Sequence, residues 1–395
     1  MANQNLNVLI LGGGFAGIKT ALELAGQSAF NVRLVSDQTD FRYYPTLYRY
    51  ATGGNPAAST IPLSEIFKGK GVEILNDSVK SLDRATKTAV GKKATYKYDV
   101  LVIGLGVVTN YFGIKGLERY SFGIKSQAEA KRLRDHIHKQ LLDDGKPDLD
   151  YIVIGGGPTG VELAGALPAY IEHVMKKHDL EERKPHIDLV EAAPRLMPRM
   201  PRSYSRALAS RLRRLGVTLH LNEAVAAASA EGLTIKDHSI SSHTVVWTAG
   251  VTNHPFFSAN NFDISQHGKV HVDQHLMVEP DIYVIGDNAE TPYSGMAQTA
   301  LYDAKYLAAN LVRKQAGKRQ RTYTPKKPIY ITPAGEGWAA VLWSNIHLYG
   351  WLGWVLRGAA DFIGYHDYEP WWTASKHWMA EMQESDECPI CAGQA

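Results

Sequence analysis

The sequence has 395 residues, with 43 lysines and arginines against 40 aspartates and glutamates, which gives a formal net charge of +3. This length exceeds one ordinary hydrophobic core, so we expect two or three domains. The near balance of charge excludes the strongly basic composition of a general nucleic-acid-binding protein, and we expect no nucleic-acid partner. The only two cysteines, Cys388 and Cys391, exclude a disulfide framework and favour a reducing cytosol. The opening residues MANQNLNVLIL have no basic segment ahead of the apolar run, so we expect no secretory signal.

The first predicted element is an apolar strand that turns directly into a helix. Val8 to Leu11 predicts the strand, and a G-x-G-x-x-G motif follows it with Gly12, Gly14 and Gly17. Glycines at these positions allow a tight turn and the close approach of a pyrophosphate. The free N–H groups and the dipole of the helix N-terminus favour its negative charge. One motif of this kind is weak evidence for a dinucleotide site.

A second loop of the same design follows further along the chain. Tyr151 to Ile154 predicts a buried strand, and Gly155, Gly157 and Gly160 repeat the glycine spacing. Because each loop is preceded by a strand and followed by a helix-forming sequence, the pair indicates two dinucleotide-binding units.

The other predicted strands fall into blocks around these loops. The first block runs to about Gly113 and includes the strand DVLVIGLG at 99–106. The second runs from about 125 to 251, and 275–290 adds a strand that ends in Gly-Asp. This order predicts an α/β fold with two Rossmann-like dinucleotide-binding domains, the second inserted in the first. We expect the first domain at 1–113 and 252–322, the second at 114–251, and a C-terminal region for membrane docking or dimerisation at 323–395.

Several segments together resemble the flavoproteins with two dinucleotide-binding domains: the two glycine loops, the strand ending in Gly286 and Asp287, and residues 295–311. Within that superfamily, three further segments are most similar to type II NADH dehydrogenases, the single-subunit NADH:quinone oxidoreductases that pump no protons: FRYYPTLYRYATGG at 41–54, ITPAGEGWAAVLW at 331–343, and the Ala297-Gln298 pair. The resemblance covers residues 6 to about 365. It implies FAD in the first domain, NADH in the second, and menaquinone or ubiquinone as the electron acceptor.

The resemblance implies that the first loop holds the FAD pyrophosphate and that the Asp287 carboxylate binds the ribityl or pyrophosphate region. One departure is Ser36, with Asp37 next, where the family usually has an acid for the adenosine ribose, and a hydroxyl makes a weaker hydrogen bond. A second departure is GLG at 104–106 in place of Ala-Thr-Gly, and neither removes a group that flavin chemistry needs. The implied FAD residues are Gly12, Gly13, Gly14, Phe15, Ala16, Gly17, Ser36, Asp37, Pro45, Gly106, Gly286, Asp287 and Ala297.

The resemblance assigns NADH to the second loop, with Glu191 as the matching acid at the end of the next strand. A carboxylate there accepts a hydrogen bond from the ribose 2′-hydroxyl and repels a 2′-phosphate, which favours NADH over NADPH. Arg195, Arg199 and Arg202 follow, and could soften that preference or be solvated loop arginines. The implied NADH residues are Gly155, Gly157, Pro158, Thr159, Gly160, Glu191 and Gly250.

Glu162 and Gln298 are the candidates for catalysis. An acid at Glu162, near the start of a helix, complements the helix dipole. The resemblance adds that type II dehydrogenases carry Glu here, facing the flavin and the quinone side, where it could relay protons. The Gln298 amide could donate to a quinone carbonyl, or cap a helix. The family motif continues to a second Gln where this chain has Tyr302, which puts the form of the quinone pocket in doubt.

The cysteine positions set this chain apart from flavin disulfide reductases and sulfide:quinone reductases, which need cysteines beside the flavin. No cysteine precedes Cys388. Cys388 and Cys391 could form a redox dithiol, half of a metal site completed by a second subunit, or reduced thiols in a disordered acidic tail. We assign no metal ligands from the sequence.

The C-terminal part of the chain carries signals of a membrane surface. Residues 313–327 contain seven lysines and arginines and no acid, and seven of the eight tryptophans lie between Trp338 and Trp378. Basic side chains are drawn to anionic lipids, and tryptophan favours the interface. Residues 337–356 carry no charge, but polar residues and glycines interrupt them, so we expect part of this segment to form a strand and not a membrane span. We expect a peripheral protein on the cytoplasmic side of the cell membrane.

One helical face near the C-terminus suits the membrane interface. It comprises Trp371, Ser375, Trp378 and Met382, with Trp372 and Met379 beside it. The same face could be buried against this chain or against a second copy, and the resemblance implies a homodimer.

The hypothesis is therefore hydride transfer from NADH to FAD and two-electron transfer to a quinone near Gln298, with no proton pumping. Two alternatives stay open. One is a soluble NADH-dependent flavoprotein that reduces a small redox protein, as rubredoxin and ferredoxin reductases do. The other is a non-enzymatic redox sensor or scaffold that binds FAD and NADH.

Overall fold

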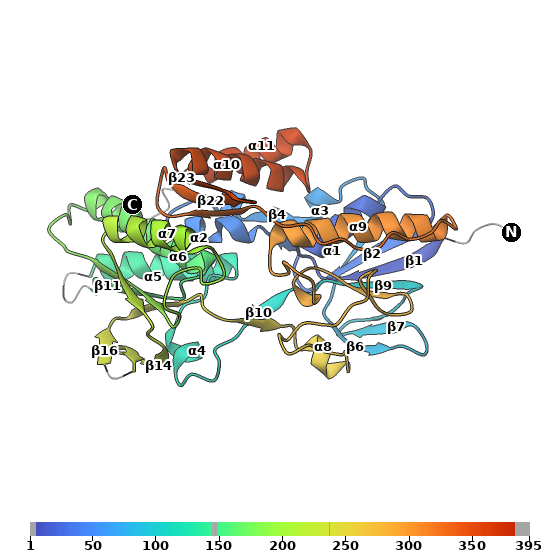
Figure 1. The fold of residues 1–395 in the computed structure, drawn as a ribbon, viewed down its shortest axis with the longest axis horizontal. Helices are drawn as coiled ribbons and strands as arrows, with labels where there is room; N and C mark the ends of the chain where they lie inside the picture. The colour runs from blue at the N-terminus through green and yellow to red at the C-terminus, as the bar shows by residue number, and fades with distance from the viewer. Residues whose placement is uncertain (1–4, 144, 146–147, 237, 384–395) are drawn as a thin grey trace.

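The computed structural model describes residues 5–143, 145, 148–236 and 238–383. Two units lie at opposite ends of an elongated molecule (Figure 1); one is built on a mainly parallel sheet and the other on a fully parallel sheet. The C-terminal helices α10 (Trp351–His366) and α11 (Trp371–Glu381) lie above them. Cys388 and Cys391 lie outside the described residues.

The first unit contains a six-stranded sheet whose central strand, β1 (Leu6–Leu11), is buried on both faces. Helices α1 (Phe15–Leu24) and α9 (Ala297–Gln315) cover one face. On one side of β1 lie β9 (Val100–Ile103), β20 (Ile282–Val284) and, at the edge, β19 (Met277–Glu279). On the other side lie β2 (Phe30–Ser36) and, at the edge, β5 (Val72–Asn76). The sheet is thus assembled from two separate stretches of the chain.

The second unit contains a four-stranded parallel sheet drawn from a single stretch of the chain. In order across the sheet, its strands are β13 (Val217–Leu221), β12 (His186–Glu191), β11 (Asp150–Ile154) and β17 (Thr244–Trp247). One face packs on α5 (Gln127–Leu141), α6 (Pro158–Lys177) and α7 (Arg202–Arg214). The predicted α/β fold, with the second Rossmann-like unit inserted in the first, is confirmed.

Two antiparallel strands connect the units. Strand β10 (Val107–Thr109) leaves the first unit and pairs with β18 (Val251–Asn253), which returns to it. These strands lie close to the expected domain boundaries at 113 and 251, which stay a prediction.

Smaller elements complete the two units. The first unit carries the pair β3 (Asp40–Arg42) and β4 (Thr60–Pro62) and the meander β6 (Val79–Asp83), β7 (Thr88–Gly91) and β8 (Thr95–Lys97). The second carries the meander β14 (Val225–Ser229), β15 (Gly232–Ile235) and β16 (His238–Ser241). Short helices are α2 (Leu47–Ala51), α3 (Leu63–Ile66), α4 (Leu117–Tyr120), α8 (Phe256–Ala259) and the 3-10 turns η1 (Tyr44–Thr46), η2 (Pro56–Ala58) and η3 (Gly286–Asn288).

The C-terminal region joins both units. Its antiparallel sheet has β21 (Tyr330–Pro333), β22 (Ala339–Trp343) and β23 (Ile346–Gly350). Its strands pack on the second unit, where the Tyr204 hydroxyl donates to the Ala340 carbonyl at 3.0 Å, while Tyr365 and Tyr368 lie in the core of the first. The expectation of a strand within 337–356 is confirmed. Among the described residues, no helix is both long enough and apolar enough to cross a bilayer.

The predicted helical face around Trp371 does not stay together as one outward surface. Trp378 turns toward α10, where its indole N–H donates to the Gly358 carbonyl at 2.8 Å and its ring lies 5.6 Å from that of Phe362. Trp378 is partly buried, and this carbonyl supplies a partner for its indole N–H. The exposed large side chains of the segment are instead Trp371, Trp372, Met379 and Met382.

Candidate active site

The first glycine loop connects β1 to α1, and one of its glycines has open space beside it. Gly12 has φ +114°, and a Cβ there would lie 2.3 Å from the Gly104 carbonyl oxygen. A Cβ on Gly17 would lie 2.0 Å from the oxygen of Gly12, so neither position tolerates a side chain. A Cβ on Gly14 would meet nothing within 4 Å, and Gly14 caps α1 without any side-chain hydrogen bond. The helix N–H groups therefore face space that a phosphate can enter.

The second loop repeats this construction in detail. A Cβ on Gly155, which has φ +117°, would lie 2.8 Å from Thr248 Oγ1, and one on Gly160 would lie 1.8 Å from the oxygen of Gly155. Gly157 faces open space and caps α6 with no side-chain hydrogen bond. The predicted residues Pro158 and Thr159 are exposed in the first turn of α6. Both loops thus present an uncapped helix N-terminus to an anion.

The acid of the second unit is fixed beside its loop. Glu191 ends β12, and its carboxylate accepts the N–H of Gly156 and the N–H of Ala193, each at 2.6 Å. In the first unit, the equivalent place at the end of β2 holds Ser36, which is buried and accepts the Gln38 N–H at 3.1 Å. At this position the second unit therefore has a charged hydrogen-bond acceptor, and the first unit has an uncharged one.

The arginines after Glu191 differ in their surroundings. Arg195 donates from Nη1 to the Met200 carbonyl at 2.6 Å and to Ser205 Oγ at 2.9 Å, so it organises its own loop. Arg199 and Arg202 are exposed.

Asp287 lies where η3 meets the first loop. A Cβ on the preceding Gly286 would lie 3.1 Å from Ala16 Cβ, which brings this turn against the start of α1. Burial raises the pKa of Asp287, while Lys269 and Lys125 act in the opposite direction. The Lys269 ammonium donates to the Asp287 carbonyl at 3.1 Å.

A buried acid holds this turn in place. Asp303 Oδ2 accepts the Gly286 N–H at 3.0 Å, and burial raises the pKa of Asp303 to about 6. Sequence reasoning missed Asp303, Lys125 and Lys269, because each acts on Gly286 or Asp287 from a distant part of the chain.

Glu162 meets the C-terminal region in a buried cluster. Its Oε1 accepts a hydrogen bond from Arg357 Nη1 at 3.0 Å, and the same guanidinium donates from Nε to Asp361 at 2.6 Å. Arg357 Nη2 donates to the carbonyl of Pro45, a predicted FAD residue, at 2.8 Å. The Tyr43 hydroxyl completes the cluster by donating to Asp361 at 3.3 Å. One arginine thus ties α6, α10 and η1 together.

Burial and the arginine have opposite effects on Glu162. Burial raises the pKa of Glu162 to about 7, and the positive charge of Arg357 limits this rise. A carboxyl group with this pKa exchanges its proton readily at neutral pH, which suits an acid that relays protons. Arg357 and Asp361 were missed, although two opposite charges four residues apart within the apolar sequence WLGWVLRGAADFIGYH were a usable signal.

Gln298 lies at the start of α9 and is exposed, and its amide bonds the backbone of Ile329. Nε2 donates to the Ile329 carbonyl and Oε1 accepts the Ile329 N–H, both at 3.0 Å. The amide keeps one further N–H for a ligand. The ring of Tyr302, one turn further along, lies 5.9 Å from that of Tyr323.

The remaining predicted residues occupy the same two neighbourhoods. Gly106 donates its N–H to Asn288 at 2.8 Å, next to Asp287, and Ala297 begins α9. The carbonyl of Phe15 accepts from the Tyr368 hydroxyl at 3.2 Å. A Cβ on Gly13 would lie 2.5 Å from Ser36 Oγ, and one on Gly250 would lie 2.2 Å from the Asn110 oxygen. Asp37 is exposed.

Comparisons with known proteins identify the family and relatives of this chain. The family model of pyridine nucleotide-disulphide oxidoreductases matches residues 6–304. The chain is similar to the type II NADH:quinone oxidoreductase Ndh of Mycobacterium tuberculosis, with 28% identity over 91% of this chain and 84% of the relative. It is 29% identical to the type II NADH:quinone oxidoreductase of Staphylococcus saprophyticus, over 79% of this chain and 83% of that relative.

The fold is also similar to a solved structure of NDH2 from Plasmodium falciparum in complex with NADH. The TM-score is 0.86 at 16% identity, and the match covers 98% of this chain and 99% of that chain. At this identity the likeness concerns the fold alone.

Proposed function

The chain belongs to the pyridine nucleotide-disulphide oxidoreductase family, and on that basis we propose that it is a flavoprotein that oxidises NADH and reduces a quinone at a membrane surface. The observation that carries the proposal is the pair of glycine loops, each of which leaves one glycine open at an uncapped helix N-terminus. The similarity to two type II NADH:quinone oxidoreductases, each over most of its length, supports the choice of electron donor and acceptor.

The residues of the first unit fit FAD. The N–H groups at the start of α1 would hold the pyrophosphate, and Asp287, Ser36 and Asp37 would accept hydrogen bonds from hydroxyl groups. FAD, when bound, supplies a centre that accepts a hydride and passes electrons on. The chain supplies position and electrostatics.

The second unit fits NADH for the same physical reason. Its loop at Gly157 is open to a pyrophosphate, and Glu191 is held rigidly beside it by two backbone N–H groups. A fixed carboxylate favours a ribose 2′-hydroxyl and opposes a 2′-phosphate. NADH is therefore the proposed donor.

Glu162 is the proposed proton carrier. Its pKa of about 7 lets its carboxyl group gain or lose a proton near neutral pH, and Arg357 orients that group from α10. Quinone reduction consumes two protons, so an acid that exchanges protons at neutral pH serves the second half of the reaction. Gln298 is the proposed contact for a quinone carbonyl, through the N–H that Ile329 does not use.

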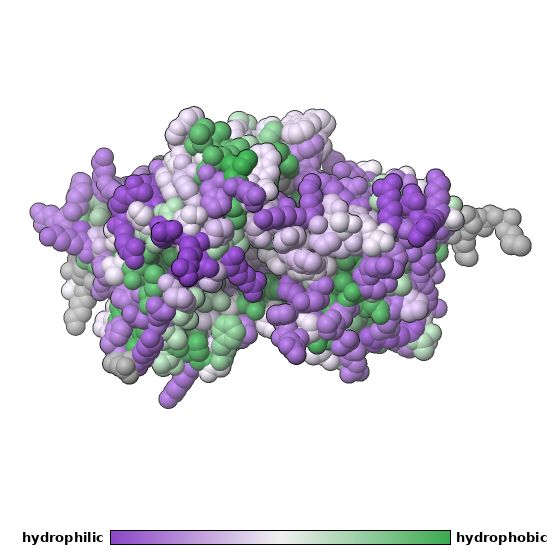
Figure 2. All heavy atoms as spheres, in the orientation of Figure 1, coloured by the Kyte–Doolittle hydropathy of each residue, from purple (hydrophilic) through white to green (hydrophobic). Residues whose placement is uncertain are grey.

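The C-terminal region offers an apolar surface for docking. Among the described residues, most of the exposed large apolar side chains fall between 343 and 382, and Figure 2 shows apolar side chains gathered at the top of the molecule, where Figure 1 places α10. We call this the apolar surface, and its residues are Trp343, Ile346, Tyr349, Trp351, Leu352, Val355, Ile363, Trp371, Trp372, Met379 and Met382.

This composition favours a lipid interface over a small soluble redox protein as the partner. Exposed tryptophans and aliphatic side chains on α10 and α11 suit the headgroup region, and exposed apolar side chains gathered in one region mark an interaction site. Peripheral attachment on the cytoplasmic side and pairing of two copies through the C-terminal region are parts of the proposal.

Steady-state oxidation of NADH by the purified protein tests the proposed function. A menaquinone analogue should raise the rate well above the oxygen background. If a small redox protein raises the rate and the quinone does not, the soluble reductase replaces the proposal. If neither accepts electrons, the chain is a binding scaffold.

A further inference from the structure

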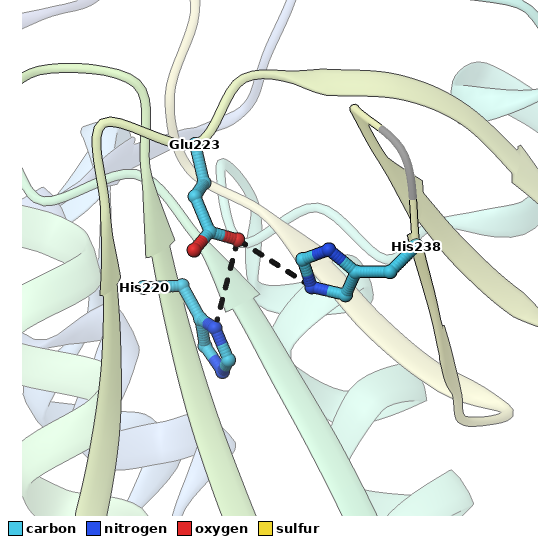
Figure 3. Close-up of side chains that lie close together, drawn as sticks. All are labelled: His220, Glu223 and His238. Carbon is cyan, nitrogen blue, oxygen red and sulfur yellow. Dashed lines mark ion pairs between the residues drawn. The ribbon is translucent and has the colours of Figure 1, made fainter.

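Three side chains with metal-binding atoms converge at the edge of the second unit (Figure 3). His220 belongs to β13, Glu223 follows that strand, and His238 begins β16. Glu223 Oε2 lies 3.7 Å from His220 Nδ1 and 3.6 Å from His238 Nε2. Each residue offers one possible ligand atom within 4.8 Å of those of the other two.

The carboxylate oxygen between the two imidazoles is poorly satisfied. Glu223 Oε2 is buried, and within the described part of the chain it accepts no hydrogen bond. A buried polar atom without a partner costs free energy, more so when it carries charge. The atom therefore needs a cation or a donor that the neighbouring backbone does not provide.

A second carboxylate fixes the orientation of His220. Asp188 is buried on β12, and its Oδ1 lies 2.8 Å from His220 Nε2 and 3.1 Å from His186 Nε2. When His220 donates its Nε2–H to this acceptor, the lone pair of Nδ1 points toward Glu223. This is the arrangement in which an outer carboxylate orients a metal-binding histidine.

We propose that His220, Glu223 and His238 bind one divalent transition-metal ion, with zinc as the best match. Two imidazole nitrogens and one carboxylate oxygen are ligands that zinc accepts, whereas calcium and magnesium prefer oxygen ligands alone. Zinc bonds of about 2.0–2.2 Å place two ligand atoms about 3.3–3.6 Å apart in a tetrahedral site. The separations of 3.7 and 3.6 Å are close to this range, and His238 is exposed, so its ring can move inward.

The ion would connect two parts of the second unit. Glu223 donates its backbone N–H to the carbonyl of Glu191 at 3.1 Å, so the site is directly linked to the end of β12. Through His238, the ion ties the β14–β16 meander to that strand end. The consequence is a stabilised second unit and a metal-dependent position for the Glu191 backbone. A fourth ligand position stays open to water.

Metal binding to the full-length protein tests the site without any enzyme assay. Cys388 and Cys391 could also take up zinc, so the background is the double variant Cys388→Ser, Cys391→Ser. After removal of metal with a chelator, zinc chloride is titrated by calorimetry, with melting temperature as a second readout. We expect one saturable site and a rise in melting temperature, and magnesium should produce neither.

Matched variants locate the ion. Glu223→Gln and His238→Ala should each weaken zinc binding about tenfold or more. His267→Ala is the control, since His267 Nδ1 lies 3.2 Å from a single carboxylate, that of Glu290, in an exposed pair. The proposal is wrong if the parent protein binds no zinc, if all variants bind zinc equally, or if only the control loses binding. The three side chains would then form ordinary histidine–glutamate ion pairs.

Discussion

The guanidinium of Arg357 donates a hydrogen bond at 3.0 Å to the carboxylate of Glu162, 195 residues earlier in the chain. The contact joins the helix of the second glycine loop to the C-terminal region, and the same arginine reaches the carbonyl of Pro45 in the first unit. The two dinucleotide-binding units and the apolar surface thus meet at one buried charge cluster. Its electrostatics generate the first two predictions.

Glu162→Gln should slow quinone reduction more than reduction of the flavin by NADH. The amide keeps the size of the side chain but carries no exchangeable carboxyl proton. Burial raises the pKa of Glu162 to about 7, so in the parent protein the protonated donor disappears as pH rises through that value. The rate of quinone reduction by the parent protein should therefore fall as pH rises through about 7, and the rate of the variant should show no such fall. Equal slowing of both half-reactions, with an unchanged pH profile, would make Glu162 a structural acid.

Arg357→Met should destabilise the protein by about 3 kcal/mol or more, because it leaves the carboxylates of Glu162 and Asp361 buried without their cation. Denaturant unfolding measures this loss. Arg357→Lys is the matched variant, since it keeps the charge but cannot make the three separate hydrogen bonds, and its loss should be smaller. A methionine variant as stable as the parent would show that the cluster contributes nothing to the fold.

Gly157→Ala and Gly160→Ala should behave differently although both change the same loop. A Cβ on Gly157 meets no atom of the chain, so this variant should fold, keep its flavin and show a raised KM for NADH. A Cβ on Gly160 would lie 1.8 Å from the Gly155 oxygen, so that variant should lose stability as well. Melting temperature, flavin content and NADH kinetics separate the two. An unaltered KM for NADH in Gly157→Ala would show that the loop is not part of the NADH site.

Replacing Trp372 and Met382 together by serine should reduce flotation with vesicles that contain anionic lipids. These side chains are 72% and 61% exposed, so their loss removes interfacial contact without emptying a core. Phe112→Ser is the control, because Phe112 is also 61% exposed but lies outside the apolar surface. If the control reduces flotation as much as the double variant does, the apolar surface is not the membrane contact.

Local patterns made much of this structure predictable. The glycine loops, their strands and the insertion of one unit into the other follow from spacings within short windows, and the structure has all of them. The acid at the end of β12 was also predictable, since it is set by the strand end before it.

Long-range pairing explains what the sequence did not reveal. Arg357 has partners 195 and 312 residues away, so no window contains the cluster, and only the start of its helix, up to residue 356, fell in the segment read as uncharged. The sequence left open whether Trp378 faces a membrane or packs on this chain, because helical periodicity identifies a face but not what covers it, and here α10 covers it through the Gly358 carbonyl. Gln298 lies beside Ile329 because the chain after α9 folds back to the start of that helix. No local sequence pattern specifies this path.

Anaerobic stopped-flow absorbance of the flavin, with two successive mixes, tests the central claim most directly. The account predicts that NADH bleaches the flavin of the purified protein and that a menaquinone analogue in lipid vesicles then restores its absorbance within the turnover time. Bleaching by NADH followed by no recovery with the quinone, while a small redox protein restores the absorbance, would contradict it.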